Sequence, residues 1–369
     1  MVKNIWRSFD LPLLLIVMVI LTLGIVLVHS ATHSTDGELP WIEQSAVKQA
    51  LFAATGLVIL LLAASVDYQL ITSFPWVIYA VALGIMALVS LFGRIGFGSR
   101  SWLTLGGNIQ PSELVKVLVI LFLSKFLADR EKEMGQLVTI VLALFVVVPP
   151  IALIYRQPDF GMALVLSLTC LGIILAAGVR LGHLVILGGG AVAIAPLVWY
   201  SLKDYMQQRI LIFLNPGTDA VGLSYNTRQA LISIGSGGWF GKGLLQGTQS
   251  QLYFLRVRHT DYIFSVLGEE LGFLGAAGLL VLFAALLWRI LRAATLAHDT
   301  CGRLIAAGVA TMIFVQVFFN TAVNLNLVPT TGLTLPLVSY GGSSLWSTLL
   351  ALGLVESVVM RHKRLEFSS

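Results

Sequence analysis

Long apolar runs recur along this chain and alternate with short polar segments. Ten of them lie near residues 11–30, 48–66, 74–93, 113–128, 137–155, 160–178, 183–202, 261–289, 303–325 and 340–360. A helix needs about 20 mostly apolar residues to cross a bilayer, because every backbone polar group must be satisfied inside the lipid. The pattern therefore predicts an all-α, polytopic integral membrane protein with about ten transmembrane helices.

The longest polar stretch separates the seventh run from the eighth. We expect one long extracytoplasmic loop over about residues 203–260, within a single membrane domain that covers residues 1–369. Loops of this length are usually functional or disordered. Its glycines lack the spacing of a nucleotide-binding P-loop, so a flexible connector is favoured, and a backbone that closely approaches a membrane or ligand is the alternative. These glycines are Gly235, Gly237, Gly238, Gly241, Gly243 and Gly247.

Composition agrees with a membrane protein. The chain is 57% hydrophobic and 11% charged, with a mean hydropathy of +0.90, whereas soluble domains carry about 25% charged residues. The first run follows two basic residues, as in a signal peptide, but Leu11–Val28 is longer than a typical h-region, so we expect a retained helix. Basic residues gather in the segments on the side of both termini, which predicts cytoplasmic termini.

Six basic residues of the long loop run against that trend. An anionic partner would explain them, although long translocated loops are also indifferent to charge. They are Lys203, Arg209, Arg228, Lys242, Arg256 and Arg258. The two cysteines, Cys170 and Cys301, and the six histidines show neither disulfide nor metal-ligand spacing, so we expect no metal site built from these side chains.

Three apolar runs begin with a carboxylate. Run four opens on Gln110-Pro111-Ser112-Glu113, run six on Gln157-Pro158-Asp159 and run eight on His259-Thr260-Asp261. Alternate runs cross in the same direction, so we expect the three carboxylates at similar depth on the outer face. Lys116 follows Glu113 by three residues, and Arg156 and Arg258 precede the other two. Helix capping explains each carboxylate singly, whereas three with neighbouring cations favour a functional site.

Polar residues also occur within the later runs. Two adjacent carboxylates, Glu269 and Glu270, would lie about 12 Å deeper than Asp261 on a continuous helix. We expect one of them to make a hydrogen bond between helices. Asn320, Asn324, Asn326 and Glu356 are similar candidates.

Five segments, in this order, resemble the signature motifs of the SEDS family of bacterial cell-wall polymerases. They are SRSWLTLGGNIQPSELVK (99–116), RQPDFGMAL (156–164), GKGLLQGTQSQL (241–252), RHTDYIFSVLGEELG (258–272) and TTGLTLPLVSYGGSS (330–344). The run at 247–252 is more similar to the elongation branch of the family than to the division branch. Two positions depart from the family pattern: Arg256-Val257 stands where Pro-Glu is usual, and Met162 replaces a frequent threonine.

The resemblance implies a peptidoglycan glycosyltransferase of the bacterial cytoplasmic (inner) membrane. It would polymerise lipid II into linear glycan strands during cell-wall elongation and release undecaprenyl diphosphate. It also implies a class B penicillin-binding protein transpeptidase as partner, within the elongation machinery, and no nucleic acid. A division-specific polymerase, a flippase for lipid-linked precursors and a noncatalytic scaffold are the alternatives.

The resemblance also implies roles for individual residues. Asp261 would be the catalytic base on the extracytoplasmic face, beside His259. Glu113 and Asp159 would organise the site or hold a divalent cation, Mg or Mn, and Trp102 and residues 336–344 would shape the pocket. Cations would contact the diphosphate: Lys116, Arg100, Arg156, Arg256 and Arg258. We expect Lys116→Ala to weaken the use of lipid II without unfolding the protein.

Overall fold

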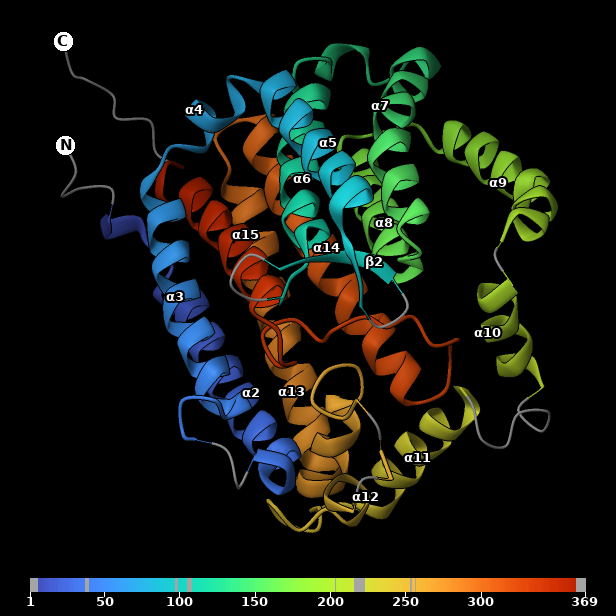
Figure 1. Ribbon diagram of the computed structural model, residues 1–369. Helices are drawn as coiled ribbons and strands as arrows, with labels where there is room; N and C mark the ends of the chain where they lie inside the picture. The colour runs from blue at the N-terminus through green and yellow to red at the C-terminus, as the bar shows by residue number, and fades with distance from the viewer. Residues whose placement is uncertain are drawn as a thin grey trace.

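The computed structural model describes residues 6–36, 40–96, 99–104, 108–202, 204–215, 223–252, 254–255 and 257–362. A long helix covers each of the ten predicted runs (Figure 1), which confirms the all-α class. These helices are α2 (Leu11–Asp36), α3 (Ser45–Ser65), α5 (Pro75–Phe92), α6 (Pro111–Ala128), α7 (Leu137–Arg156), α8 (Phe160–Ala176), α9 (Leu181–Ser201), α13 (Ile263–Leu296), α14 (Thr300–Asn324) and α15 (Gly342–Met360).

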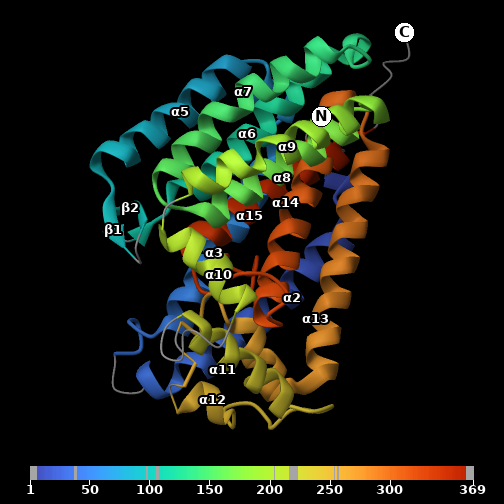
Figure 2. The same cartoon turned by 90° about the vertical axis from the view of Figure 1, so that its right-hand side faces the viewer.

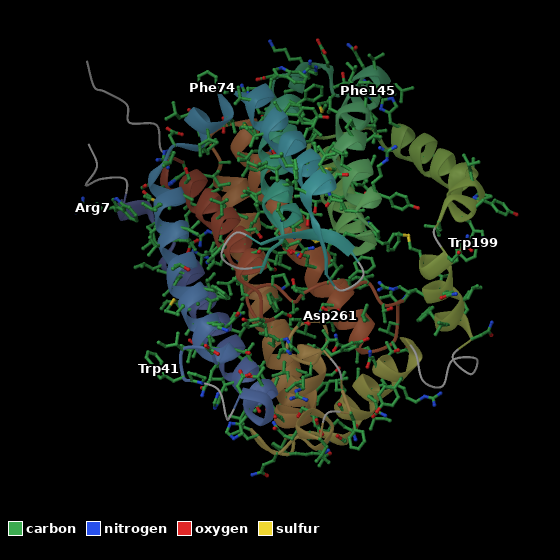
Figure 3. The ribbon with its side chains drawn as sticks, in the orientation of Figure 1. Arg7, Trp41, Phe74, Phe145, Trp199 and Asp261 are labelled. Carbon is green, nitrogen blue, oxygen red and sulfur yellow. The ribbon has the colours of Figure 1, made fainter. Side chains whose placement is uncertain are left out.

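Seven of these helices, all except α6, α8 and α9, are long and apolar enough to cross a membrane by length and composition. Large apolar side chains also face outward from the bundle. Phe145 on α7 is 75% exposed (Figure 3), and Trp288 on α13 is 72% exposed. Exposed apolar surface of this extent marks contact with lipid or protein rather than with water. The chain is therefore a multi-pass membrane protein, and the count of ten spans stays a prediction.

The short elements lie between the long helices. They are η1 (Trp6–Ser8), α4 (Tyr68–Thr72), η2 (Glu131–Glu133) and a small antiparallel sheet of β1 (Arg94–Gly96), β2 (Ser99–Thr104) and β3 (Asn108–Ile109). The sheet connects α5 to α6, with Arg94 opposite Trp102 and Leu103 opposite Ile109. The apolar pattern does not predict this sheet, because its strands are too short to show an alternation.

The expected loop over residues 203–260 is partly helical. It contains α10 (Asp204–Leu214), α11 (Leu223–Ser236) and α12 (Thr248–Gln251). In Figure 1, α10 stands beside the bundle below α9, and α11 and α12 lie at the lower end of the molecule. The stretch does separate α9 from α13 as expected, but it is not irregular throughout: α11 packs on α13 and α14, and α12 packs on α2.

Two ends of the bundle can be defined from these elements. The upper end holds α4 and the end of α15, and the lower end holds α11 and α12 (Figure 1). At the upper end Arg289 of α13 pairs with Asp10, whose backbone N–H donates to Glu356 of α15 at 3.1 Å. Figure 2 shows α13 running along one edge of the molecule between the two ends. Helix α14 lies against α6, α8, α13 and α15 and so forms the centre of the bundle.

The eighth run is not one continuous helix. Gly272 has φ 65° and ψ −163°, which breaks α13 after Leu271. Residues 238–243 pair with the break through backbone hydrogen bonds, including Lys242 N to Glu269 O at 3.0 Å and Phe273 N to Gly238 O at 2.8 Å. These bonds satisfy polar groups that the break would otherwise leave without partners.

The glycines near residue 240 serve this close packing. A Cβ at Gly237 would lie 1.9 Å from the carbonyl oxygen of Gly268, and one at Gly241 would lie 2.1 Å from that of Glu270. A side chain larger than hydrogen therefore does not fit at either position. The connector interpretation is wrong here, and the close backbone approach is made to α13 rather than to a membrane or ligand.

Glu269 and Glu270 lie just before the break, in the part of α13 that begins at Ile263. Glu269 is fully buried and accepts from Lys242 Nζ at 2.9 Å, as well as from the backbone N–H groups of Gln249 and Ser250. Glu270 accepts from the hydroxyl of Ser30, near the lower end of α2, at 2.6 Å. Residues 263–271 form one helical segment, but its carboxylates pair with groups at the lower end of the bundle, so the prediction that they lie deeper in the membrane than Asp261 is wrong. Their partners belong to the segment before α13 and to α2.

Candidate functional site

Glu113, Asp159 and Asp261 come together although they belong to three different helix starts. The charge of Glu113 raises the pKa of Asp159, and the charge of Asp159 in turn raises that of Asp261. Such effects need short separations in a protein interior. Asp261 lies near the centre of the molecule in Figure 3, between the level of β2 and the lower helices.

Asp159 is placed by the start of α8. Its Oδ1 accepts from the backbone N–H of Met162 at 3.1 Å, so it is a true N-cap, and its Oδ2 accepts from Gln110 Nε2 at 2.8 Å. Desolvation nevertheless raises the pKa of Asp159 to about 6, with a further contribution from the charge of Glu113. The capping interpretation of this carboxylate is confirmed, and its functional role stays a prediction.

Glu113 and Lys116 form a buried ion pair within the first two turns of α6. The two side chains are 2.8 Å apart, and the Lys116 residue is 1% exposed. Ser347 of α15 donates its hydroxyl to Glu113 at 3.0 Å. The pairing predicted from the spacing is present, and both side chains are buried.

The backbone around Asp261 is fixed by hydrogen bonds from distant segments. Three successive carbonyl groups, those of residues 259, 260 and 261, each accept a bond. The donors are the N–H of Tyr340 at 2.9 Å, the hydroxyl of Ser339 at 2.6 Å, and the side-chain amides of Asn320 and Asn324, both at 3.0 Å. The expected interhelical bond is confirmed for Asn324, which accepts from the Ser265 hydroxyl of α13 at 2.6 Å, whereas Asn320 donates to carbonyls of segments between helices. The backbone that carries the Asp261 side chain is consequently held in place.

The residues from 330 to 344 complete this enclosure. Gly332 adopts φ +71°, and a Cβ there would lie 3.8 Å from the Asp261 carboxylate. Ser343 accepts a hydrogen bond from the backbone N–H of Gln110 at 2.9 Å, and Thr334 and Ser344 are joined by a hydroxyl contact of 3.0 Å. One segment thus links the starts of α6 and α13.

Among the described residues, the cation whose charge lowers the pKa of Asp261 is Arg209 of α10. Desolvation raises the pKa of Asp261 to about 6, while the Thr260 hydroxyl and the Arg209 charge oppose this rise. Sequence reasoning assigned this place to Arg258. Arg258 instead is 5% exposed, and its Nε donates to the carbonyl of Ala31 at the end of α2. Arg209 appeared only as one of six loop cations, and its spacing in the sequence gave no sign of its position.

His259 stands beside Asp261 in sequence but faces a different neighbour. Its ring packs edge-on against Tyr340, with centroids 5.7 Å apart. Desolvation, assisted by the charge of Arg258, lowers the pKa of His259 from its ordinary value of 6.5. The imidazole is therefore neutral at pH 7, so His259 adds no positive charge near Asp261.

Four other residues were predicted to contact the diphosphate or to shape the pocket. Arg156 is exposed at the end of α7. Arg100 and Trp102 lie on β2, and only their backbone is described. Arg256 lies outside the described residues. Their roles as ligand contacts stay predictions.

The carboxylates do not form a cage for a cation on their own. Within the described part of the chain, no group of three or more His, Cys, Asp or Glu side chains is arranged to hold a metal ion. A magnesium or manganese ion at Glu113 and Asp159 would need oxygen ligands from a bound phosphate, which is the usual way in which such ions meet substrate. The divalent cation stays a prediction.

Comparison with known sequences gives matches over nearly the whole chain. Residues 11–364 match the family described as cell cycle protein, which groups FtsW, RodA and SpoVE. Stage V sporulation protein E of Bacillus subtilis is 38% identical over 95% of this chain and 97% of its own. Peptidoglycan glycosyltransferase MrdB of Escherichia coli is 35% identical over 99% of this chain and 98% of its own. A probable peptidoglycan glycosyltransferase FtsW of Trichlorobacter lovleyi is 37% identical over 95% of this chain and 93% of its own.

Solved structures show the same likeness. A chain from work on coordinated polymerization and crosslinking by a peptidoglycan synthase complex superposes with a TM-score of 0.83 and 32% identity, over 97% of this chain and 100% of its own. The rod shape determining protein RodA of Thermus thermophilus superposes with a TM-score of 0.72 and 31% identity, over 97% of this chain and 99% of its own.

Proposed function

Because the chain belongs to the FtsW, RodA and SpoVE family, we propose that it is a peptidoglycan glycosyltransferase that joins lipid II units into linear glycan strands. Relatives that match over more than nine tenths of the chain carry the name peptidoglycan glycosyltransferase. The run at 247–252 favours the elongation branch, and the division branch is the alternative. The observation that carries the proposal is the half-buried Asp261, whose backbone is held by Asn320 and Asn324 and whose pKa is raised by burial and lowered by the charge of Arg209.

The chemistry assigns Asp261 the role of base. A sugar hydroxyl of one lipid II molecule gives its proton to the Asp261 carboxylate, and its oxygen forms the new bond to C1 of the second sugar. The bond between C1 and the phosphate oxygen breaks, and its electron pair leaves with undecaprenyl diphosphate. A base works best when its pKa lies near the working pH. A pKa of about 6 keeps Asp261 ionised at pH 7 and more basic than an exposed aspartate.

The other residues support this step from fixed positions. Arg209 is a described cation whose charge lowers the pKa of Asp261, and it suits the charge that develops on the departing diphosphate. Burial raises the pKa of Asp261, and the charge of Asp159 adds to this rise. The Glu113 and Lys116 pair holds α6 against α15 through Ser347 and acts as a positioning element rather than as a diphosphate contact.

The cellular setting extends this proposal. The chain would lie in the bacterial cytoplasmic (inner) membrane with both termini in the cytoplasm and the Asp261 site on the outer face. A class B penicillin-binding protein would crosslink the strands that it makes. The likeness to a chain of a peptidoglycan synthase complex supports a partner of this kind.

The test compares Asp261→Asn with the native protein, purified with its transpeptidase partner and supplied with lipid II. We expect native protein to form glycan strands and Asp261→Asn to lose at least about a hundredfold in rate, within the range for removal of a general base. Asp261→Glu, which keeps a carboxylate, should recover part of the rate. Normal strand formation by Asp261→Asn would overturn the assignment of the base. A native protein that moves lipid II across vesicle bilayers without forming strands would be a flippase.

A further inference from the structure

Arg209 lies between two cavities on the side of Asp261 that faces α10. One cavity of about 200 Å³ and one of about 130 Å³ are both lined by Arg209, Val328, Pro329 and Thr330. The Arg209 Nη1 donates to the carbonyl oxygen of Thr330 at 3.1 Å, which fixes the guanidinium at their shared wall. A ligand that fills both cavities must therefore pass the guanidinium.

The larger cavity is almost entirely apolar. Side chains of α8, α10 and α14 form its wall, among them Leu164, Met206 and Phe319. Its polar members include Thr331, whose side-chain hydroxyl is buried without a hydrogen-bond partner among the described residues. An orphaned hydroxyl in an apolar cavity is costly unless a ligand or water reaches it. The cavity suits a hydrocarbon chain with a polar group at one end.

The smaller cavity is basic. It is lined by Arg209 and Arg228, together with Thr227 and Asn326. Two guanidinium groups around one space suit an anion with more than one negative oxygen, because each group can bind phosphate oxygens through two parallel hydrogen bonds.

The two cavities connect to the catalytic position through the chain itself. Thr330 and Thr331 line the cavities, and the next residue, Gly332, lies against the Asp261 carboxylate. The charge of Arg209 also lowers the pKa of Asp261. An anion held by Arg209 would consequently sit within electrostatic reach of the base.

We infer that these cavities form the subsite for the prenyl diphosphate that leaves during polymerisation. The diphosphate lies between Arg209 and Arg228, and the isoprene units next to it enter the apolar cavity lined by Leu164 and Phe319. A volume of about 200 Å³ is below that of a full ligand pocket, so only the part of the chain nearest the diphosphate fits there. This inference rests on the proposed function, since it names the place of the leaving group in that reaction.

Direct binding tests the subsite without requiring catalysis. The purified protein in detergent, with its partner, is titrated with farnesyl diphosphate, farnesol, inorganic pyrophosphate and short-chain phosphatidylglycerol, and dissociation constants are measured. We expect farnesyl diphosphate to bind at least about tenfold more tightly than the other three, because only it combines two negative phosphates with an isoprene chain. Arg209→Gln should weaken it roughly tenfold to a hundredfold.

A matched pair of substitutions on α8 tests the chain-binding part. Leu164→Trp fills the apolar cavity and should weaken the binding of farnesyl diphosphate while leaving the binding of pyrophosphate unchanged. Leu171→Trp, on the same helix but 39% exposed and not lining the cavity, should change neither. Retained pyrophosphate binding shows that Leu164→Trp is folded.

Three results would overturn the subsite. If farnesyl diphosphate binds Arg209→Gln and Leu164→Trp as tightly as the native protein, it does not bind in these cavities. Pyrophosphate that binds as tightly as farnesyl diphosphate would indicate a bare anion site. Equal binding of phosphatidylglycerol would indicate a general lipid phosphate site. Strand formation by native protein is measured separately, so loss of the subsite and loss of the proposed function are distinguishable.

Discussion

The buried pair between Lys116 and Glu113 allows a quantitative prediction about stability. Lys116→Met removes the ammonium but keeps an unbranched side chain of similar length, so the packing of α6 changes little. Glu113, which is 3% exposed, then keeps only the hydroxyl of Ser347 among its described partners. The variant therefore isolates the cost of a buried carboxylate without its cation.

The size of the effect follows from the geometry. At the observed 2.8 Å, an effective dielectric constant of about 20 gives a Coulomb attraction of about 6 kcal/mol. Part of this is offset, because the lysine ammonium no longer has to be desolvated. Removal of one member of a buried pair costs about 3–5 kcal/mol in measured cases, and we expect a loss in that range. The sequence-based expectation that Lys116→Ala leaves the fold intact is revised accordingly.

Unfolding by sodium dodecyl sulfate in mixed micelles, followed by circular dichroism, gives the free energy of unfolding. Lys125→Met is the matched control on the same helix, because its partner Asp129 is 48% exposed and its own side chain 31% exposed. We expect the control to cost less than about 1 kcal/mol. The double variant Lys116→Met with Glu113→Gln should recover most of the loss, since glutamine still accepts from Ser347.

Two outcomes would refute this reasoning. Equal losses for Lys116→Met and Lys125→Met would show that burial does not strengthen the pair. A double variant as unstable as Lys116→Met alone would show that the loss comes from packing and not from the unpaired carboxylate.

Two further predictions concern the base and the break in α13. The polymerisation rate should rise as pH passes through about 6, because the base must be ionised, and Asp159→Asn should move that midpoint to lower pH by removing a negative neighbour. Because the folded state raises the pKa of Asp261, the protonated carboxyl stabilises the fold fully below pH 3.8, and this stabilisation is lost as pH rises through about 6. Resistance to SDS should therefore decline over the same pH range in which the polymerisation rate increases. A rate midpoint near pH 4 would contradict both predictions. Gly241→Ala should destabilise the protein strongly, because its Cβ would meet the Glu270 carbonyl at 2.1 Å and its φ is +81°. Gly235→Ala, in α11 with open space around it, should stabilise by up to about 1 kcal/mol, and equal losses in SDS unfolding would count against the packing argument.

Local features of the chain were predictable for a clear physical reason. Apolar runs of membrane length and polar starts such as Gln157-Pro158-Asp159 depend only on neighbouring residues, and helices cover all ten runs. Asp159 caps α8 as its position at a helix start suggests. The Glu113 and Lys116 pair follows from helical spacing alone. The small sheet escaped because its strands are short, and α10 and α11 escaped because they are amphipathic and too polar to appear as apolar runs of membrane length.

By itself, the sequence determined the membrane class, the helices and the three carboxylates at helix starts, since these follow from hydropathy, periodicity and capping within a few residues. Only the tertiary structure decided which cation acts on Asp261, because Arg209 reaches it through the path of α10 and not through neighbouring residues. The break at Gly272 likewise depends on hydrogen bonds from residues 238–243. Long-range packing therefore set the electrostatics of the base, while local chemistry supplied the groups from which the site is built.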